Sequence, residues 1–212
     1  MKYKGNPSAG GAHSVVADLV PSGSRVLDVG CASGYLGEAL RAKGCRVWGV
    51  DGDARSLAAV PANVYEDVTR LDLDHDQPPW PHLSFDVVVA ADVLEHLVSP
   101  VPALEALIRR LDHGGKVIVS VPNVANVVVR GRLLLGQFEY QDVGILDRTH
   151  LHLYTFATAQ RLLEDCGLQV EGLFSGSDRF GGLLNGSPVI GRLLRGLLAY
   201  NVVAVGRLPP TG

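Results

Sequence analysis

The chain has 212 residues, 47% of them hydrophobic, and a formal net charge of −3. This length suits one α/β domain and is too short for two, so we expect a single domain over residues 1–212. The small negative charge argues against a mainly electrostatic grip on nucleic acid, and no apolar run is long enough for a membrane span. Residues 1–11 do not resemble a secretory signal, and the three cysteines lack disulfide or metal spacing. We therefore expect a cytoplasmic, reduced protein.

Short apolar runs alternate with helical patterns in the first part of the chain. The apolar runs predict strands at Arg25–Val29, Arg46–Val50, Asn63–Glu66, Phe85–Ala90 and Lys116–Val121. Hydrophobic residues at helical spacing predict helices at Ala12–Val20, Leu36 to about Lys43, Arg55–Val60 and Ser99–Leu111. Residues 69–84 are polar and contain prolines, which is typical of a loop. This alternation predicts a mostly parallel sheet with right-handed crossovers.

Residues 123–154 interrupt the alternation. They contain an apolar helical pattern at Val127–Leu135, followed by mixed residues without a clear core pattern. A long insertion on a regular scaffold is more often functional than not, so we expect this one on the substrate side. Regular patterns return afterwards and predict a helix, a strand, a helix and a strand at Thr155–Cys166, Leu168–Phe174, Val189–Leu198 and Asn201–Arg207.

A glycine-rich turn follows the first predicted strand. Gly30 and Gly34 allow a sharp turn and the close approach of a ligand to the backbone. The fit to a dinucleotide fingerprint is poor, because Ala32 and Tyr35 occupy the positions of its second and third glycines. Asp28 precedes the turn, and a carboxylate there would repel a diphosphate but attract an ammonium group. The turn therefore indicates a ligand with a cationic end and no phosphates.

Acidic residues also follow the next two predicted strands. Asp51, in Val50-Asp51-Gly52, stands at the usual position of a ribose-hydroxyl acceptor in nucleotide-binding α/β folds. Asp67 follows the third predicted strand, where it could accept a hydrogen bond from an adenine amino group. Three acids at three successive strand ends indicate a nucleoside that carries an amino-acid tail.

These segments resemble class I S-adenosylmethionine-dependent methyltransferases. Leu27 to Gly34 is similar to the first motif of that family, Asp51 to its ribose-binding acid, and Glu66 to Val68 to its adenine-contacting segment. Phe85–Leu97 is similar to its fourth-strand motif, and Gly114–Asn123 to the segment around its next strand.

The resemblance covers about residues 12–175 and implies both a fold and a cofactor. The fold is a Rossmann-like seven-stranded sheet, mostly parallel with an antiparallel last strand, with helices on both faces. The cofactor is S-adenosyl-L-methionine, which becomes S-adenosyl-L-homocysteine. The residues assigned to cofactor binding are Asp28, Gly30, Cys31, Gly34, Asp51, Gly52, Asp67, Val68, Ala91 and Asp92.

The insertion resembles that of small-molecule methyltransferases, near those of ubiquinone, natural-product and sugar O-methylation. The similar stretches are Ser120–Asn123, Arg130–Gly136 and Asp147–Thr155. The resemblance implies methyl transfer to a small-molecule acceptor, with a hydroxyl as the expected group. N- or C-methylation on the same scaffold stays an alternative, and so does a noncatalytic cofactor-binding subunit that resembles a protein associated with bacterial methionine biosynthesis. We expect no nucleic-acid partner and a monomer or homodimer.

Two histidines of the insertion are candidate catalytic bases. His150, His152 and Tyr154 alternate with leucines, so the three polar rings would share one face of an extended segment. An imidazole is the default base for removing a hydroxyl proton as that hydroxyl attacks a methyl group. The alternative for each histidine is simple packing and hydrogen bonding.

Glu95 and His96 follow the fourth predicted strand and are further catalytic candidates. In ubiquinone O-methyltransferases, an acid followed three residues later by Glu-His is thought to hold a divalent cation, and Asp92 takes the place of that acid here. Two carboxylates and an imidazole suit a hard cation. The alternative, which we favour, is that Glu95 and His96 start a helix and bond locally, so no metal is assigned.

Overall fold

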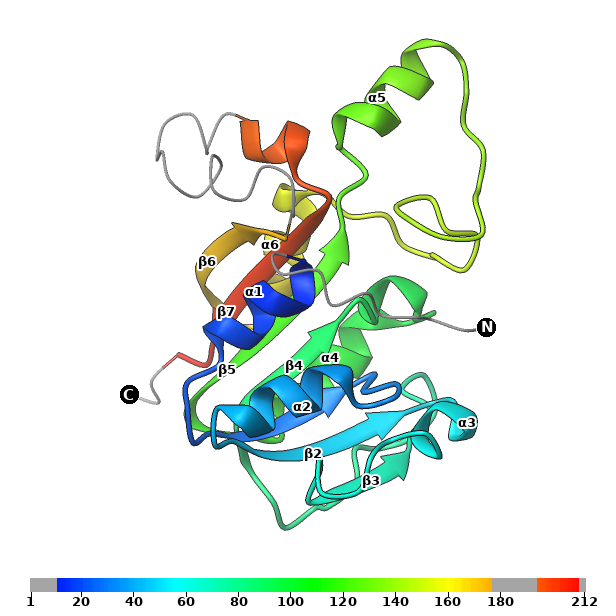
Figure 1. Ribbon diagram of the computed structural model, residues 1–212. Coiled ribbons are helices and arrows are strands. Elements are labelled where there is room, and N and C mark those ends of the chain that lie inside the picture. The colour runs from blue at the N-terminus through cyan, green and yellow to red at the C-terminus, as the bar shows by residue number, and fades with distance from the viewer. Residues whose placement is uncertain (1–10, 177–193, 210–212) are drawn as a thin grey trace.

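The computed structural model describes residues 11–176 and 194–209. A seven-stranded sheet forms its centre, in the order β3-β2-β1-β4-β5-β7-β6 (Figure 1). The strands are β1 (Arg25–Val29), β2 (Arg46–Asp51), β3 (Asp67–Arg70), β4 (Phe85–Ala91), β5 (Leu111–Pro122), β6 (Gln169–Ser175) and β7 (Asn201–Arg207). β7 runs antiparallel to β5 and β6, whereas the other paired strands are parallel. The predicted fold class is confirmed.

Helices cover both faces of the sheet (Figure 1). They are α1 (Ala12–Leu19), α2 (Tyr35–Ala42), α3 (Ala54–Leu57), the 3-10 turn η1 (Leu94–His96), α4 (Pro100–Ile108), α5 (Val127–Leu134) and α6 (Phe156–Asp165). Side chains of α1 and α2 pack with Val26 and Val89 on one face, and those of α4 and α6 pack with Leu27 and Val88 on the other. The central strands are therefore buried on both sides, as their continuous apolar runs require.

The third strand lies further along the chain than predicted. Residues 63–66 are not extended as a strand: Asn63 has a φ of +72°, and the Tyr65 side chain reaches away to Asp28. Pairing with β2 begins only at Asp67. β3 is the edge of the sheet and its residues are exposed or only partly buried, so it lacks the apolar run by which an inner strand is found in a sequence.

Two further element ends can be compared with the sequence. β5 begins at Leu111, ahead of the predicted start at Lys116, because Leu111 pairs with Phe85 before the register of the two strands shifts. The helix predicted at Thr155–Cys166 begins as expected, since Thr155 and Thr158 form a reciprocal capping box at the start of α6.

Parts of two predictions fall outside the described residues. Of the predicted helix Val189–Leu198, residues 194–198 are helical and residues 189–193 lie outside. The polar residues 1–10 lie outside as well. Within the described ranges, no helix combines the length and the hydropathy that crossing a bilayer needs.

α5 and the chain that follows it extend beyond the carboxyl end of β5, away from the sheet (Figure 1). We call residues 123–154 the substrate-side segment, after the side on which the sequence predicts them to lie. It has a small buried cluster of its own, formed by Val129, Ile145 and Leu146. Its base is closed by a hydrogen bond from the Val124 N–H to the Tyr154 carbonyl oxygen at 2.8 Å. The segment is therefore a closed loop anchored at the strand ends.

Candidate active site

A cavity of about 520 Å³ opens at the carboxyl ends of β1, β2 and β4. Its wall consists of the glycine turn after β1, the end of β2, residues 70–73 at the end of β3, and parts of residues 91–97 after β4. Small-molecule sites commonly enclose roughly 300–1,000 Å³, and open α/β sheets bind their ligands beyond the carboxyl ends of the strands. This cavity is therefore the candidate active site.

The glycine turn is fixed to β2 by its backbone. The Gly30 and Cys31 N–H groups donate to the Val50 carbonyl oxygen at 2.8 and 3.0 Å. Gly30 has a φ of +73°, and a Cβ at this position would lie 2.4 Å from Val93 Cγ2. Gly34 has a φ of +91° where α2 begins. The turn therefore needs glycine at position 30 both for its conformation and for space.

Asp28 lines the cavity and is only 1% exposed. Tyr65 Oη donates a hydrogen bond to Asp28 Oδ2 at 2.7 Å. Burial raises the pKa of the Asp28 carboxyl to about 7, and the hydrogen bond from Tyr65 opposes that rise. A buried carboxylate with a single donor would be stabilised further by a cationic group in the cavity.

Tyr65 was not among the site residues predicted from the sequence. Its ring lies over two glycines, one in α2 and one in β2: a Cβ at Gly37 would be 2.3 Å from Tyr65 Cζ, and a Cβ at Gly49 would be 3.0 Å from Tyr65 Cε1. Glycine destabilises the interior of a helix or a strand. The two glycines were the signal that could have pointed to a large side chain packed against both elements.

Asp51 and Gly52 line the cavity at the end of β2. Asp51 Oδ2 accepts a hydrogen bond from the Ala32 N–H at 2.8 Å, and Oδ1 accepts one from the Asp53 N–H at 2.8 Å. These bonds hold the carboxylate against the glycine turn. Each oxygen keeps a further lone pair, so Asp51 can still accept hydrogen bonds from the hydroxyls of a ligand.

Asp67 and Val68, expected to contact the ligand, do not line the cavity. Asp67 opens β3 beside Trp48, in the middle of β2, and its carboxylate accepts a hydrogen bond from Trp80 Nε1 at 2.9 Å. The prediction placed this contact too early in the chain because it placed the strand too early. The residues that line the cavity at this edge are Arg70, Leu71, Asp72 and Leu73.

Ala91 and Asp92 line the cavity after β4, where the sequence had placed them. Asp92 has a φ of +55°. Its Oδ1 accepts hydrogen bonds from Ser120 Oγ at 2.8 Å and Asn201 Nδ2 at 2.9 Å. The carboxylate is therefore bound to β5 and β7, and it is not part of a group of metal-ligand atoms in the described residues.

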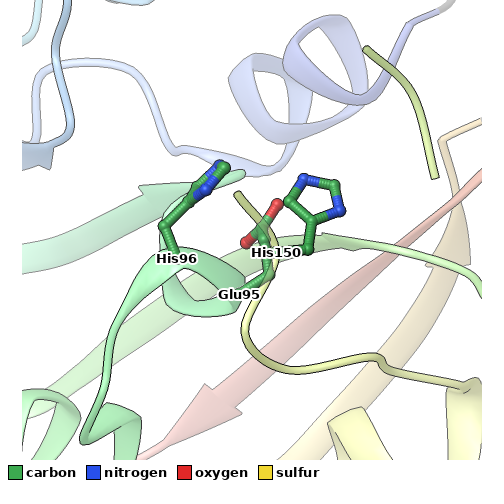
Figure 2. Close-up of side chains that lie close together, drawn as sticks. All are labelled: Glu95, His96 and His150. Atoms are coloured by element: carbon green, nitrogen blue, oxygen red, sulfur yellow. The ribbon is translucent and has the colours of Figure 1, made fainter. Parts of the chain in front are cut away.

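Glu95, His96 and His150 come together where η1 meets the substrate-side segment (Figure 2). One ligand-type atom from each of the three lies within 4.8 Å of the others, and the two imidazole centroids are 4.8 Å apart. We call these residues the Glu–His–His cluster. His96 lines the cavity, whereas Glu95 and His150 are buried at 1% and 9% exposure. The cluster therefore touches the cavity through His96.

The cluster has unusual electrostatics. Burial raises the pKa of Glu95 well above its usual range, and the charge of Asp92 adds to the rise. Burial lowers the pKa of His96, which favours its neutral ring near pH 7. Neither carboxylate oxygen of Glu95 has a hydrogen-bond partner among the described residues. Glu95 and His96 do lie in a helical turn, as expected, but the expectation that the Glu95 carboxylate bonds locally is wrong. Its carboxylate and the two imidazoles are ligand types that bind divalent transition metals.

His152 does not join the cluster. Its Nε2 lies 3.4 Å from the Val98 carbonyl oxygen. The backbone bends at Leu151 and His152, and Leu151 is 56% exposed. The expected extended strip, with polar rings on one face and leucines on the other, is therefore not formed.

The chain is similar to known methyltransferases. Residues 11–173 match the family described as a methyltransferase domain. The ubiquinone biosynthesis O-methyltransferase of Idiomarina loihiensis is 36% identical over 108 residues, which cover 48% of this chain and 43% of the relative. That of Paracidovorax citrulli is 36% identical over 137 residues, which cover 56% of each chain. The chain thus spans about half the length of the curated relatives it matches.

Solved structures of low sequence identity share the fold. A chain of the complex that contains the Haloferax volcanii Trm112 methyltransferase activator has a TM-score of 0.68 at 22% identity, over 95% of this chain and 90% of that one. Magnesium protoporphyrin IX methyltransferase from Synechocystis PCC 6803, with bound S-adenosylhomocysteine, has a TM-score of 0.61 at 19% identity, over 92% and 78%. At these identities the likeness shows the fold alone.

Proposed function

We propose that this chain methylates a hydroxyl group of a small molecule. The chain belongs to the methyltransferase domain family and is a class I S-adenosylmethionine-dependent methyltransferase. The similarity to ubiquinone biosynthesis O-methyltransferases supports a hydroxyl acceptor. A cytoplasmic setting stays a prediction, and it rests on three cysteines that are all free.

One observation carries the proposal: a single cavity joins the glycine turn to the Glu–His–His cluster. At one end Asp28 would face the ammonium group of S-adenosylmethionine, and Asp51 would accept hydrogen bonds from its ribose hydroxyls. Leu71 and Leu73 would pack against its adenine ring. At the other end His96 lines the same cavity. The cofactor's methyl group would then lie between the turn and the substrate-side segment.

The reaction is an in-line displacement. The acceptor oxygen forms a bond to the methyl carbon while the bond from that carbon to the sulfonium breaks, and S-adenosylhomocysteine leaves with the electron pair on its sulfur. The acceptor loses its hydroxyl proton. Holding two reactants in line supplies much of the rate in such a step.

The chain's own residues have two tasks in this step. The cavity positions the cofactor, and the Glu–His–His cluster adjoins the place where the hydroxyl proton must leave. The neutral imidazole of His96 suits that role because a base must carry a free lone pair. The His150 ring packs edge-on against the His96 ring, with centroids 4.8 Å apart. His152 lies outside the cluster and stays a weaker candidate for the base.

The divalent cation implied by the resemblance fits this chain, though not on the expected residues. Glu95, His96 and His150 would hold it, because their ligand-type atoms form one group in the described residues, to which Asp92 does not belong; Asp92 Oδ1 accepts from Ser120 and Asn201 instead. Such a cation, when bound, would occupy the lone pair of His96 and take the place of that base, because it lowers the pKa of a coordinated hydroxyl and orients it.

N- or C-methylation on the same scaffold remains the alternative chemistry. A noncatalytic cofactor-binding subunit remains the alternative role. A monomer or a homodimer stays a prediction for either role. The substrate-side segment favours a catalytic role, because it brings His150 against His96, which lines the cavity.

The test is turnover with a panel of phenols, catechols, sugars and amines. S-adenosylhomocysteine release is measured together with the mass and the carbon spectrum of the product. We expect methyl ethers from hydroxyl acceptors. Products methylated only on nitrogen or carbon would overturn the hydroxyl assignment. Cofactor binding without turnover on any acceptor would favour the noncatalytic role, and absence of cofactor binding would overturn the assignment of the cavity.

A further inference from the structure

We propose that the Glu–His–His cluster binds one divalent transition-metal cation, and that this cation fastens the substrate-side segment to η1. The site differs in two ways from the one that the resemblance to ubiquinone O-methyltransferases suggested. His150 is its third ligand in place of Asp92, and its two imidazoles favour a first-row transition metal over magnesium or calcium. The proposal rests on the proposed function only in assigning residues 123–154 to the acceptor side.

The three ligand atoms lie slightly further apart than a shared cation needs. They lie within 4.8 Å of one another, whereas ligands bound at about 2.0–2.2 Å from a metal are at most about 4.4 Å apart. Side-chain rotations that shift the atoms by a few tenths of an ångström or more would bring them to coordination distance.

The Glu95 carboxylate lacks any other partner. It is 1% exposed, and neither oxygen has a hydrogen bond within the described ranges. A buried carboxylate without a partner is strongly unfavourable. Figure 2 shows this carboxylate beside the two imidazole rings, in the group that the three side chains form. A cation bound to all three groups would supply the missing partner.

The two imidazoles present free lone pairs. His96 Nδ1 lies 3.2 Å from the Thr149 carbonyl oxygen, and His150 Nδ1 lies 3.0 Å from the Ile145 carbonyl oxygen. A carbonyl oxygen only accepts, so each Nδ1 carries the proton and each Nε2 keeps its lone pair. Donation of the second ring nitrogen to a backbone carbonyl is the usual support of a metal-bound histidine.

The cluster joins two parts of the chain that already touch. Glu95 and His96 belong to η1, and His150 belongs to the substrate-side segment. The Leu151 and His152 N–H groups both donate to the Glu95 carbonyl oxygen, at 2.8 and 3.1 Å. A cation held by side chains on both sides of this junction would resist its opening, and so would order the acceptor side of the cavity.

The experiment uses the full chain after treatment with a chelator. Co²⁺ is titrated and followed by its visible absorption, and Zn²⁺ and Mn²⁺ are titrated by calorimetry. We expect one cation per chain. Loss of an outer-shell partner commonly weakens metal binding by about 10–100-fold, so Glu95→Gln or His150→Gln, which remove a ligand, should weaken it by at least about 100-fold.

Two variants serve as matched controls. His113→Gln and Glu105→Gln remove an exposed imidazole and an exposed carboxylate far from the cluster in the fold. Both should bind the cation as the unaltered chain does. Far-UV circular dichroism and thermal unfolding check that the cluster variants are folded. If Glu95→Gln does not fold, His150→Gln decides the outcome.

The fastening is read from amide hydrogen exchange with and without the cation. We expect slower exchange at Leu151 and His152 in the unaltered chain and no change in His150→Gln. No binding by the unaltered chain, or binding by the cluster variants as tight as that of the unaltered chain, would overturn the cation site. Binding without slower exchange would overturn the fastening. S-adenosylmethionine affinity is measured separately. Loss of that affinity would count against the proposed function and not against the cation site.

Discussion

The glycine turn and the substrate-side segment contribute to one cavity in opposite ways. In the turn, the groups that face the cavity already have protein partners: Gly30 and Cys31 donate to Val50, Asp51 accepts two backbone N–H groups, and Asp28 accepts from Tyr65. The turn is therefore preformed, as a site for a constant ligand should be.

Next to the substrate-side segment a buried carboxylate lacks a hydrogen bond within the described part of the chain, and on the segment itself apolar side chains are exposed to solvent. Glu95, against which it packs, has no hydrogen bond to its carboxylate among the described residues. On its outer side Leu134 is 88% exposed and Val143 is 72% exposed. The comparison suggests that the turn only receives its ligand, whereas the segment is completed by what it binds. Changes in the turn should therefore alter cofactor affinity, and changes in the cluster should alter turnover.

The largest expected effect is that of His96→Gln. Loss of the imidazole that lines the cavity should lower turnover by about 100-fold or more, because acid–base assistance is commonly worth about 10²–10⁴-fold. S-adenosylmethionine affinity by calorimetry should be unchanged. His152→Gln is the matched comparison, since that ring lies outside the cluster, and its turnover should fall far less. A larger loss from His152→Gln would reverse the assignment.

Gly30→Ala tests the turn itself. A Cβ at this position would overlap Val93, so the variant should bind S-adenosylmethionine more than about 10-fold more weakly, a loss of at least about 1.4 kcal/mol. The control is Gly44→Ala. Gly44 has a φ of +77°, but a Cβ there would meet nothing within 4 Å. That variant should lose roughly 1–2 kcal/mol of folding stability from the left-handed backbone alone, with cofactor affinity intact.

Asp51→Ala tests the proposed ribose contact. Charge-assisted hydrogen bonds are worth about 1.5–3 kcal/mol each, so we expect S-adenosylmethionine affinity to fall by about 10-fold or more. Asp67→Ala is the comparison, because Asp67 faces Trp80 and not the cavity. Equal losses in the two variants, measured by calorimetry, would contradict the placement of the cofactor.

Tyr65→Phe should have the smallest effect and the clearest pH dependence. The ionised form of Asp28 attracts an ammonium group, so S-adenosylmethionine affinity should rise as pH passes through about 7. The Tyr65 hydroxyl lowers the pKa of Asp28, so its removal should move that rise to higher pH and weaken binding at pH 7 by about 3–10-fold. An unshifted affinity profile would remove Tyr65 from cofactor positioning. Tyr140→Phe, on the exposed part of the substrate-side segment, is the control.

The Asp28 carboxyl should also make the folding stability depend on pH, in the opposite direction to cofactor affinity. The pKa of Asp28 is raised on folding, from about 3.9 in the unfolded chain to about 7, so the folded form binds its proton more tightly. The stability that this proton contributes is fully present below about pH 4 and is lost as pH rises through about 7. Asp28→Asn should remove that decline, as denaturant unfolding at several pH values would show.

The sequence alone was enough for the inner strands, the glycine turn and Asp51, because each depends on a short run of residues and on backbone geometry. β3 was predicted too early in the chain, because an edge strand is half exposed and lacks an apolar run. The position of Asp67 was lost with it.

The Glu–His–His cluster could not be predicted for a different reason. The resemblance to ubiquinone O-methyltransferases suggested Asp92 with Glu95 and His96, but Asp92 bonds to Ser120 and Asn201, two residues far from it in the sequence. His150 takes its place only because the substrate-side segment folds back onto η1. Such contacts depend on tertiary structure, and the local pattern around each residue carries no record of them.

The packing of Tyr65 over Gly37 and Gly49 has a consequence for how this protein can change over time. A Cβ at Gly37 would meet only the Tyr65 ring among its nearest atoms, whereas a Cβ at Gly49 would also lie 2.9 Å from Cys31 Sγ. Tyr65 and Gly37 should therefore be inherited together, and Gly49 should persist whether or not the ring does. Among descendants of this sequence, those that lose the tyrosine should be free to gain alanine at the helix position, and they would need another donor for Asp28.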